Sequence, residues 1–363
     1  MEQDKKSITR RKFLQVGGSL ALGAVFMGVM GRSVWKMLTS PADIFYDAKE
    51  TIRTKDAIER AQFVSPFRRT FGFLAPDEIV ALELLGEQIV VATPNNIYVY
   101  GLDGSLKENF SVRSDVRDMA VYENRLYLLF PSRIEVYDAQ GSPLQQWEAC
   151  SDDADYCSLT VFAGGVFVTD ASAKNICQYH LDGTLARFIK SPNGFVVPSY
   201  SFGITNLDNQ VFCSNPGRHL VEKYSADGEY MGSFGKSGAG AGEFSGCCNP
   251  VQITTTAAGE RIRVGGLSPG LLLTSEKGLP RISCYTPDGT FRSILLDDKA
   301  LGGGHAAYDV RVMGDKLIVT GGRKVSVFQY DDRRSAQGRM GDGTSGMTLC
   351  GACTVDCPMK VLS

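Results

Sequence analysis

Short apolar runs separated by polar turns recur along most of the chain. The clearest copy is the stretch from Gly270 to Gly289, which has an apolar run, a polar loop, a second apolar run ending at Tyr285, and a Pro-Asp-Gly turn. Alternate positions within these runs are apolar or aromatic, which is the period of a β-strand. The pattern therefore predicts a protein made of short strands joined by tight turns.

Six copies of this unit can be aligned on the aromatic residue that closes the second run. These aromatic residues are separated by intervals of 37, 42, 45, 61 and 43 residues, and they are Tyr100, Tyr137, Tyr179, Tyr224, Tyr285 and Phe328. A period of roughly 40 residues is typical of propeller blades. Each unit divides into four strands, with the fourth strand after an Asp-Gly or equivalent turn. We expect an all-β fold, a six-bladed β-propeller over residues 63–336.

The sixth copy ends in a charged segment, residues 331–334, that offers little apolar surface for an outer strand. The segment from Phe63 to Leu74 reads as an outer strand that precedes the first blade. Pairing it into the sixth blade would close the ring and remove the exposed sheet edges. We therefore expect the first strand of the propeller to complete its last blade.

The N-terminus carries Arg10, Arg11 and Lys12 before an uncharged run of 19 residues from Phe13 to Gly31. This arrangement resembles a twin-arginine export signal, although an ordinary membrane anchor has the same elements. The resemblance implies export of an already folded protein, commonly one loaded with a cofactor. Residues 1–40 are expected to be this signal.

Nineteen apolar residues are near the lower limit for crossing a bilayer, and no Ala-x-Ala cleavage site follows Gly31. We expect an uncleaved anchor in the cytoplasmic membrane, with the basic residues on the cytoplasmic side and the propeller on the periplasmic or extracytoplasmic side. Residues 41–62 have apolar positions at helical spacing and predict a helical spacer.

The segment from Phe234 to Val251 contains Phe-Gly, a glycine-rich stretch, Gly-x-Phe and then Pro250. This order resembles the segment between blades of NHL-repeat propellers. The resemblance implies a propeller that often serves as a protein-interaction scaffold. The chain departs from the NHL pattern by inserting residues 245–249, which include Cys247 and Cys248, before the proline.

Residues 337–363 form a Gly- and Ser-rich linker followed by Cys350, Cys353 and Cys357-Pro358. The spacing Cys-x2-Cys-x3-Cys-Pro resembles the end of a bacterial ferredoxin cluster motif, whose further cysteine is replaced here by Met347. The resemblance implies an iron-sulfur cluster, either 4Fe-4S or 3Fe-4S. A zinc site, a disulfide or an unstructured tail remain alternatives.

A 4Fe-4S cluster needs a fourth ligand, and Cys247 and Cys248 are the internal candidates. In a propeller, their loop should open on the same face as the loop after residue 275. We therefore expect Asn249, Glu276, Lys277 and Arg281 to form the wall of the site. Alternatively, Cys247 and Cys248 pack as small apolar groups or form a vicinal disulfide.

The other cysteines have simpler interpretations. Cys177, Cys213 and Cys284 lie within strands and are expected to be buried core residues. Cys150 and Cys157 flank a short acidic loop and could form a disulfide in an oxidising compartment. The loops between second and third strands each hold a basic residue in five blades, which would make a cationic rim: Arg133, Lys174, Arg218, Lys277 and Arg323.

The charge balance gives no reason to expect nucleic-acid binding, since 38 basic and 40 acidic residues leave a formal net charge of -2. Three histidines also argue against a multi-histidine metal centre. The leading hypothesis is electron transfer or redox-complex assembly with a protein partner in the cell envelope, rather than a stand-alone enzyme. The alternatives are an NHL-type scaffold without a metal, and a lactonase- or lyase-like enzyme using Asp118, Asp309 and Asn206 of the inner strands.

Overall fold

The structure, a computed structural model, describes residues 64–113, 115–198, 201–246, 248–256, 270–303 and 307–331. The chain divides into the units Met1–Gln62 and Phe63–Ser363, and only the second contains described residues. The expected export signal, the spacer and the cysteine tail all lie outside the described residues. None of the helices in the described ranges is long and apolar enough to cross a membrane.

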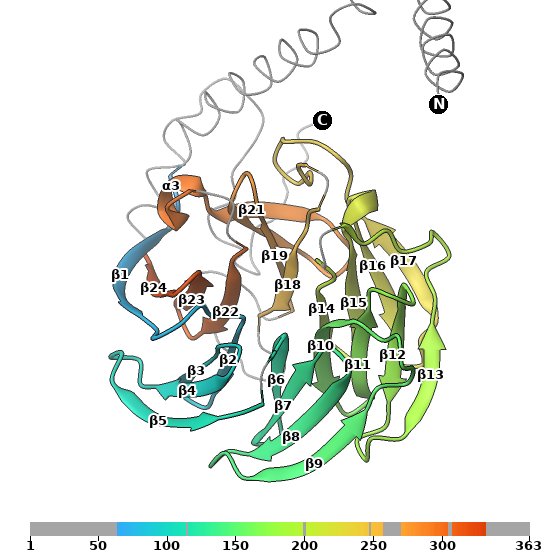
Figure 1. The fold of residues 1–363 in the computed structure, drawn as a ribbon. Coiled ribbons are helices and arrows are strands. Elements are labelled where there is room, and N and C mark those ends of the chain that lie inside the picture. Colours follow the sequence, from blue (N-terminus) through green and yellow to red (C-terminus); the bar gives the residue numbers. More distant parts are fainter. Residues whose placement is uncertain are drawn as a thin grey trace, which may run out of the picture. The chain divides into compact units, whose positions relative to one another are not determined.

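The described residues form six antiparallel sheets of four strands each (Figure 1). The first three blades follow chain order from the inner to the outer strand. Blade 1 contains β2 (Ala81–Leu85), β3 (Gln88–Ala92), β4 (Asn96–Tyr100) and β5 (Leu106–Ser111). Blade 2 contains β6 (Asp118–Tyr122), β7 (Arg125–Phe130), β8 (Arg133–Asp138) and β9 (Pro143–Glu148). Blade 3 contains β10 (Tyr156–Phe162), β11 (Gly165–Asp170), β12 (Asn175–Tyr179) and β13 (Leu185–Ile189).

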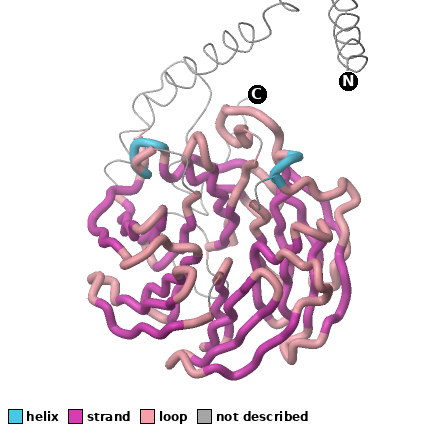
Figure 2. Tube along the Cα trace, in the orientation of Figure 1, coloured by secondary structure: helices cyan, strands magenta, loops and turns pink. Residues whose placement is uncertain are grey.

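The next two blades have the same order from inner to outer strand. Figure 2 shows that strands and loops make up almost all of the described chain. Blade 4 contains β14 (Ile204–Leu207), β15 (Gln210–Asn215), β16 (Leu220–Ser225) and β17 (Tyr230–Phe234), with the 3-10 helix η2 (Pro216–Arg218) between β15 and β16. Blade 5 contains β18 (Gln252–Thr255), β19 (Leu272–Glu276), β20 (Arg281–Tyr285) and β21 (Phe291–Leu296), followed by the short helix α3 (Asp298–Leu301).

Blade 6 is assembled from both ends of the propeller. It contains β22 (Asp309–Met313), β23 (Lys316–Gly321), β24 (Lys324–Tyr330) and, as its outer strand, β1 (Phe67–Leu74). The register pairs Phe67 with Tyr330 and Leu74 with Lys324. The predicted closing strand is therefore confirmed, and Figure 1 shows β1 beside β24.

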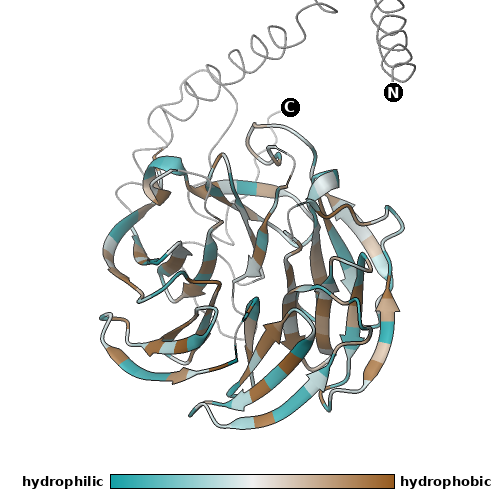
Figure 3. Cartoon of the chain, in the orientation of Figure 1, coloured by the Kyte–Doolittle hydropathy of each residue, from teal (hydrophilic) through white to brown (hydrophobic). Residues whose placement is uncertain are grey.

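The hydrophobic core is divided into six layers, each between two neighbouring blades. Cysteine, aromatic and aliphatic side chains of blades 2 and 3 make one layer, and those of blades 5 and 6 make another. The other four blade-to-blade contacts have the same construction. The inner strands contact one another around the ring, including β22 with β2. Hydrophobic residues therefore lie mainly in the strands that face a neighbouring blade, whereas hydrophilic residues occupy the loops and much of the outer strands, such as β9 (Figure 3).

Candidate functional site

The two loops predicted to form a wall lie in contact at one end of blade 5. The Asn249 side chain donates from Nδ2 to the carbonyl oxygens of Ser245, at 2.7 Å, and Lys277, at 2.9 Å. The backbone N–H of Lys277 donates to Asn249 Oδ1 at 2.9 Å. The first bond closes the 245–250 loop on itself, and the two bonds with Lys277 attach this loop to the β19–β20 turn. Asn249 and Lys277 therefore lie side by side, as the sequence predicts.

Two of the residues expected at the wall surface, Glu276 and Arg281, instead form a buried ion pair. Glu276 and Arg281 are 0% and 5% exposed, and Arg281 Nε lies 2.5 Å from Glu276 Oε1. Arg281 also donates from Nη1 to the carbonyl oxygens of Ala239 and Gly240 and from Nη2 to that of Glu243. Glu276 Oε2 accepts from the Ser245 N–H at 3.0 Å. The pair thus attaches the glycine-rich segment, residues 239–245, to the sheet. Its two charges are paired with each other and with backbone groups rather than with solvent.

The predicted cysteine ligands are only partly within the described residues. Cys248 is 6% exposed, whereas Cys247, Cys350, Cys353 and Cys357 lie outside the described ranges. The ammonium group of Lys277 is directed to Ser201 Oγ, 3.4 Å away. His219, which the sequence did not single out, contacts the carbonyl oxygen of Gly246 through Nε2. Lys277 therefore supplies a cationic group at this wall, and its ammonium group is not part of the Glu276–Arg281 pair.

Three of the five basic residues expected to form a cationic rim make contacts within the propeller. Arg133 Nε lies 2.6 Å from Glu135 Oε1, and its guanidinium covers the Phe130 ring at 3.7 Å. Arg218 and Arg323 donate from Nε to carbonyl oxygens of Gly194 and Ala75. Arg218 and Arg323 thus attach neighbouring segments to their blades, whereas the Arg133 contacts stay within its own hairpin.

The inner strands contain acidic groups that are buried, as Asp118 is, or partly buried, as Asp309 and Glu83 are. Asp118 Oδ2 accepts from Ser158 Oγ at 2.5 Å and from the Leu159 N–H at 3.0 Å, in the next blade. Asp309 Oδ2 likewise accepts from the Leu82 N–H at 3.2 Å, in blade 1. Burial raises the pKa of Asp118 to about 7, despite the opposing hydrogen bond from Ser158. The two aspartates are thus inter-blade acceptors.

Arg311 and Glu83 complete this inner set, and sequence reasoning had not identified either. Arg311 lies 2.5 Å from Asp309 Oδ1 and 2.8 Å from Glu83 Oε1. Burial raises the pKa of Glu83, while the charge of Arg311 opposes the rise. Asn206, the third predicted residue, donates to Thr160 Oγ1 at 2.7 Å. Each of these polar groups therefore links one blade to the next.

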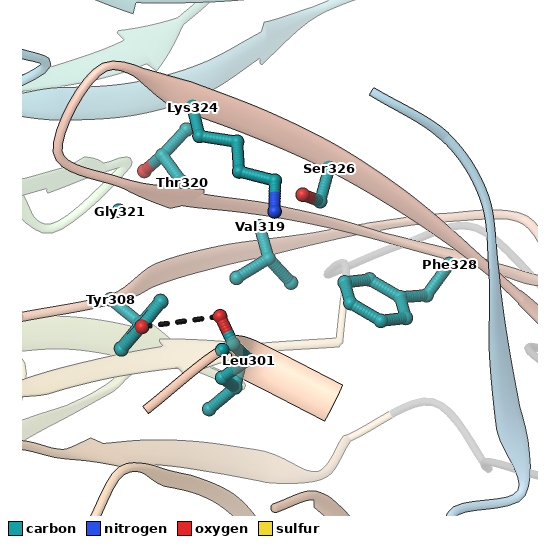
Figure 4. Close-up of a pocket in the computed structure, with 9 residues that line it drawn as sticks. Leu301, Tyr308, Val319, Thr320, Gly321, Lys324, Ser326 and Phe328 are labelled. Carbon is teal, nitrogen blue, oxygen red and sulfur yellow. Dashed lines mark hydrogen bonds between the residues drawn. The ribbon is translucent and has the colours of Figure 1, made fainter. Parts of the chain in front are cut away.

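A pocket of about 230 Å³ lies in blade 6 and was not anticipated from the sequence. Figure 4 shows Lys324 and Ser326 on one side and Tyr308 and Leu301 on the other. The Tyr308 hydroxyl donates to the carbonyl oxygens of Leu301, at 3.2 Å, and Gly303, at 3.0 Å. The pocket has one cationic side chain, Lys324, at an otherwise apolar and hydroxyl-bearing wall.

The predicted disulfide between Cys150 and Cys157 is wrong. Both thiols are free, and Cys150 Sγ lies 3.2 Å from Cys177 Sγ instead. Cys157 Sγ lies against the carbonyl oxygen of Asp155, at 3.6 Å. The reason is that the loop carries Cys150 across to the third strand of blade 3, a long-range contact that close sequence spacing cannot indicate. Cys177, Cys213 and Cys284 are buried, as predicted.

No model of a known protein family matches the chain, and no curated protein matches it. Solved structures similar to this one include a virginiamycin B lyase from Staphylococcus aureus, at 13% identity and a TM-score of 0.48, covering 72% of this chain and 99% of that one. BamB from Moraxella catarrhalis has 12% identity and a TM-score of 0.40, covering 69% of each chain. The Neurospora crassa Pan2 WD40 domain has 8% identity and a TM-score of 0.44, covering 69% of this chain and 75% of that one.

At these identities and TM-scores, the likeness carries no argument about function. The fold assignment rests on the sheet order and the contacts between inner strands in this chain. The chain is a six-bladed β-propeller.

Proposed function

We propose that this protein is an exported propeller of the cell envelope that carries an iron-sulfur cluster on its C-terminal tail and transfers electrons within a protein complex. The observation that carries the proposal is the spacing of Cys350, Cys353 and Cys357-Pro358. Short loops between thiolates allow them to bind one face of a single cluster. Such a cluster supplies reversible one-electron transfer.

The wall of blade 5 supports this proposal through its rigidity and charge. The hydrogen bonds of Asn249 and the Glu276–Arg281 pair hold the segment next to Cys248 in one conformation. Lys277 adds a cationic group at the same wall. A cationic, preorganised surface suits an anionic cluster or an acidic partner. Cys248 is buried and the same bonds hold its loop, so the wall acts in this proposal as a docking surface for the tail cluster. Cys248 would become the fourth ligand only after its loop broke these bonds.

The test is anaerobic purification of the full chain, followed by iron and sulfide analysis and electron paramagnetic resonance. We expect about three or four irons per chain, and their loss in a variant with Cys350, Cys353 and Cys357 replaced by serine. Cys213→Ala, which changes a buried cysteine of β15, is the matched control and should retain the iron. Cys248→Ser should lower cluster occupancy if Cys248 is the fourth ligand. Iron-free protein after reconstitution with iron and sulfide would exclude the proposal.

The second candidate is a metal-free interaction scaffold. It is favoured by the use of Asp118, Asp309 and Glu83 as links between blades, since these carboxylates are engaged by N–H, hydroxyl and guanidinium donors. Colourless protein that still captures an envelope partner through the blade 5 wall would support the scaffold. A lactonase- or lyase-like activity is the third candidate, and hydrolysis or elimination of a lactone substrate by metal-loaded protein would favour it.

Location in the envelope follows from the N-terminal motif in this proposal. We expect the full chain to fractionate with the cytoplasmic membrane and to face the periplasm, because an uncleaved apolar run would anchor it. Replacing Arg10 and Arg11 by lysine should leave the protein in the cytoplasm. Export that is unaffected by this change would show that the twin-arginine resemblance is misleading.

A further inference from the structure

Three metal-binding side chains meet between blades 2 and 3, away from the wall described above. Cys150 follows β9 of blade 2, whereas Asp170 and Cys177 belong to β11 and β12 of blade 3. The sulfurs of Cys150 and Cys177 and a carboxylate oxygen of Asp170 all lie within 4.8 Å of one another. Asp170 and Cys177 are 0% exposed, and Cys150 is half-buried.

One carboxylate oxygen of Asp170 accepts three hydrogen bonds, and the other accepts none from the described residues. Oδ1 accepts from the N–H groups of Asp155, Ser172 and Ala173, at 3.1, 2.9 and 3.2 Å. Oδ2 is buried and has no hydrogen-bond donor among the described residues. Buried carboxylate oxygens are almost always hydrogen-bonded or bound to a metal. The three bonds to Oδ1 hold the carboxylate in place, so Oδ2 is positioned to bind a cation.

In blade 4, the side chains at the three equivalent positions form hydrogen bonds with one another. Ser191 and Cys150 each lie two residues beyond the outer strand of the preceding blade, while Asn215 corresponds to Asp170 and Glu222 to Cys177 in the strand registers. Ser191 Oγ and Asn215 Nδ2 donate to Glu222 Oε1 at 2.9 and 2.8 Å. Blade 3 has replaced this hydrogen-bonded set with two thiols and a carboxylate, which are zinc ligands.

We propose that Cys150, Asp170 and Cys177 bind a divalent cation of the zinc class, which links blade 2 to blade 3. With zinc–sulfur bonds of about 2.3 Å in a tetrahedron, the two sulfurs would stand about 3.8 Å apart. The observed 3.2 Å requires a shift of well under 1 Å, whereas a disulfide of about 2.05 Å requires a larger one. Binding converts two thiols to thiolates and releases two protons.

Two tyrosines lie beside the Cys150 ligand, and Tyr156 contacts it directly. The Tyr156 hydroxyl donates to Cys150 Sγ at 3.3 Å and accepts from the Cys150 N–H at 3.0 Å. It also contacts the hydroxyl of Tyr179. Hydrogen bonds of this kind orient ligating sulfurs and stabilise the thiolate form. The three protein ligands leave a fourth position on the cation for water.

The experiment measures zinc in the full chain, purified anaerobically without chelators, with Cys350, Cys353 and Cys357 replaced by serine so that the tail contributes nothing. We expect one zinc per chain, and cobalt substitution should produce sulfur-to-cobalt charge-transfer absorption. Asp170→Asn preserves size and Oδ1 and should fold, yet bind zinc at least about tenfold more weakly. Cys150→Ser and Cys177→Ser should remove the charge-transfer band in part, and Cys213→Ala should change neither readout.

Several results would overturn the proposal. Zinc-free protein in this background, after incubation with zinc chloride, would exclude the site. So would mass-spectrometric detection of a Cys150–Cys177 disulfide in the anaerobically purified protein, because it would leave no thiolate to bind. Unchanged zinc affinity in folded Asp170→Asn, verified by circular dichroism, would remove Asp170 from the ligands and leave its unpaired oxygen unexplained.

Discussion

At the scale of single residues, the inner aspartates show how a polar side chain can be part of the ring's framework. Asp118 receives two hydrogen bonds from blade 3 and a third from the Met119 N–H. Burial is the largest influence on its pKa, and the charge of Asp309 acts in the same direction. Asp118 therefore holds a proton in the folded protein at pH values where an exposed aspartate is ionised.

This raised pKa predicts a specific pH dependence of stability. Between pH 3.8 and about 7, the folded state keeps a proton that the unfolded state has already released. The stability contributed by protonated Asp118 is therefore fully present below pH 3.8 and is lost as the pH rises to about 7. Asp118→Asn cannot titrate, so its stability relative to the wild type should increase from pH 4 to pH 7, by on the order of a few kcal/mol.

Urea denaturation at several pH values measures this difference. Asp227→Asn changes an aspartate whose side chain is 84% exposed and serves as the control, which should show no such trend. A constant difference between Asp118→Asn and the wild type across this range would contradict the prediction.

The Glu276–Arg281 pair leads to a second prediction at the same scale. Arg281→Met removes the partner of a fully buried carboxylate and should lower the free energy of unfolding by about 3–5 kcal/mol. The double variant Glu276→Gln/Arg281→Met should lose less than the sum of the single variants, because no unpaired charge remains. Chemical denaturation measures these values, and Arg187→Met at an exposed pair should cost less than about 1 kcal/mol. Additive losses would mean that the two side chains act independently.

At the scale of the blade, the Asp-Gly turns do more than reverse the chain. Asp182 Oδ1 accepts from the N–H and hydroxyl of Thr184, which lowers the pKa of Asp182. Gly183 adopts a φ of +89°, and a Cβ there would lie 2.4 Å from Trp147 Nε1 in the preceding blade. The glycine is thus required both by the turn and by the close approach of the neighbouring outer strand.

Gly183→Ala should therefore destabilise the protein by about 1–3 kcal/mol, combining backbone strain with displacement of Trp147. Gly86→Ala is the matched control, since Gly86 also has a positive φ, +59°, but no atom within 4 Å of the added carbon. Thermal unfolding and tryptophan fluorescence separate the two effects. Equal losses in both variants would show that contact with Trp147 contributes nothing.

At the scale of the whole propeller, closure depends on one strand from the beginning of the sequence. β1 completes blade 6 by pairing with β24, and Phe67 of β1 is buried among Leu295, Leu296 and Phe328. Because each core layer lies between two blades, an incomplete blade also weakens its neighbours. The ring therefore needs β1 for stability as well as for covering an edge.

A chain that begins at Ala75 should lose this strand and aggregate through the exposed edge of β24, with a much lower unfolding temperature. A chain that begins at Val64 keeps β1 and is the control, which should remain monomeric with nearly unchanged stability. Size-exclusion chromatography and calorimetry provide the readouts. Equal behaviour of the two truncated chains would show that β1 is dispensable for closure.

The strands and turns were predictable from the pattern of neighbouring residues in the sequence. The contacts between buried polar side chains were not. The alternation of side chains identified the strands, and the position of Asp-Gly turns identified the hairpins, because both depend on neighbours in sequence. The contacts of Arg311 with Glu83, and of Cys150 with Cys177, join different blades. The alternation of side chains along a strand predicts which face of the sheet a residue lies on. It does not predict which side chain of the next blade packs against that residue.

The candidate site, like the fold, was predictable in part. Sequence alone determined the six blades, the closing strand and the proximity of Asn249 to the 276–281 loop, since a repeated unit places equivalent loops on one face. Only the tertiary structure decided that Glu276 and Arg281 are buried within the wall, and that Asp170 lies beside two sulfurs with an unpaired oxygen. The physical reason is that burial and the meeting of distant groups arise from packing between blades, which local patterns leave unspecified.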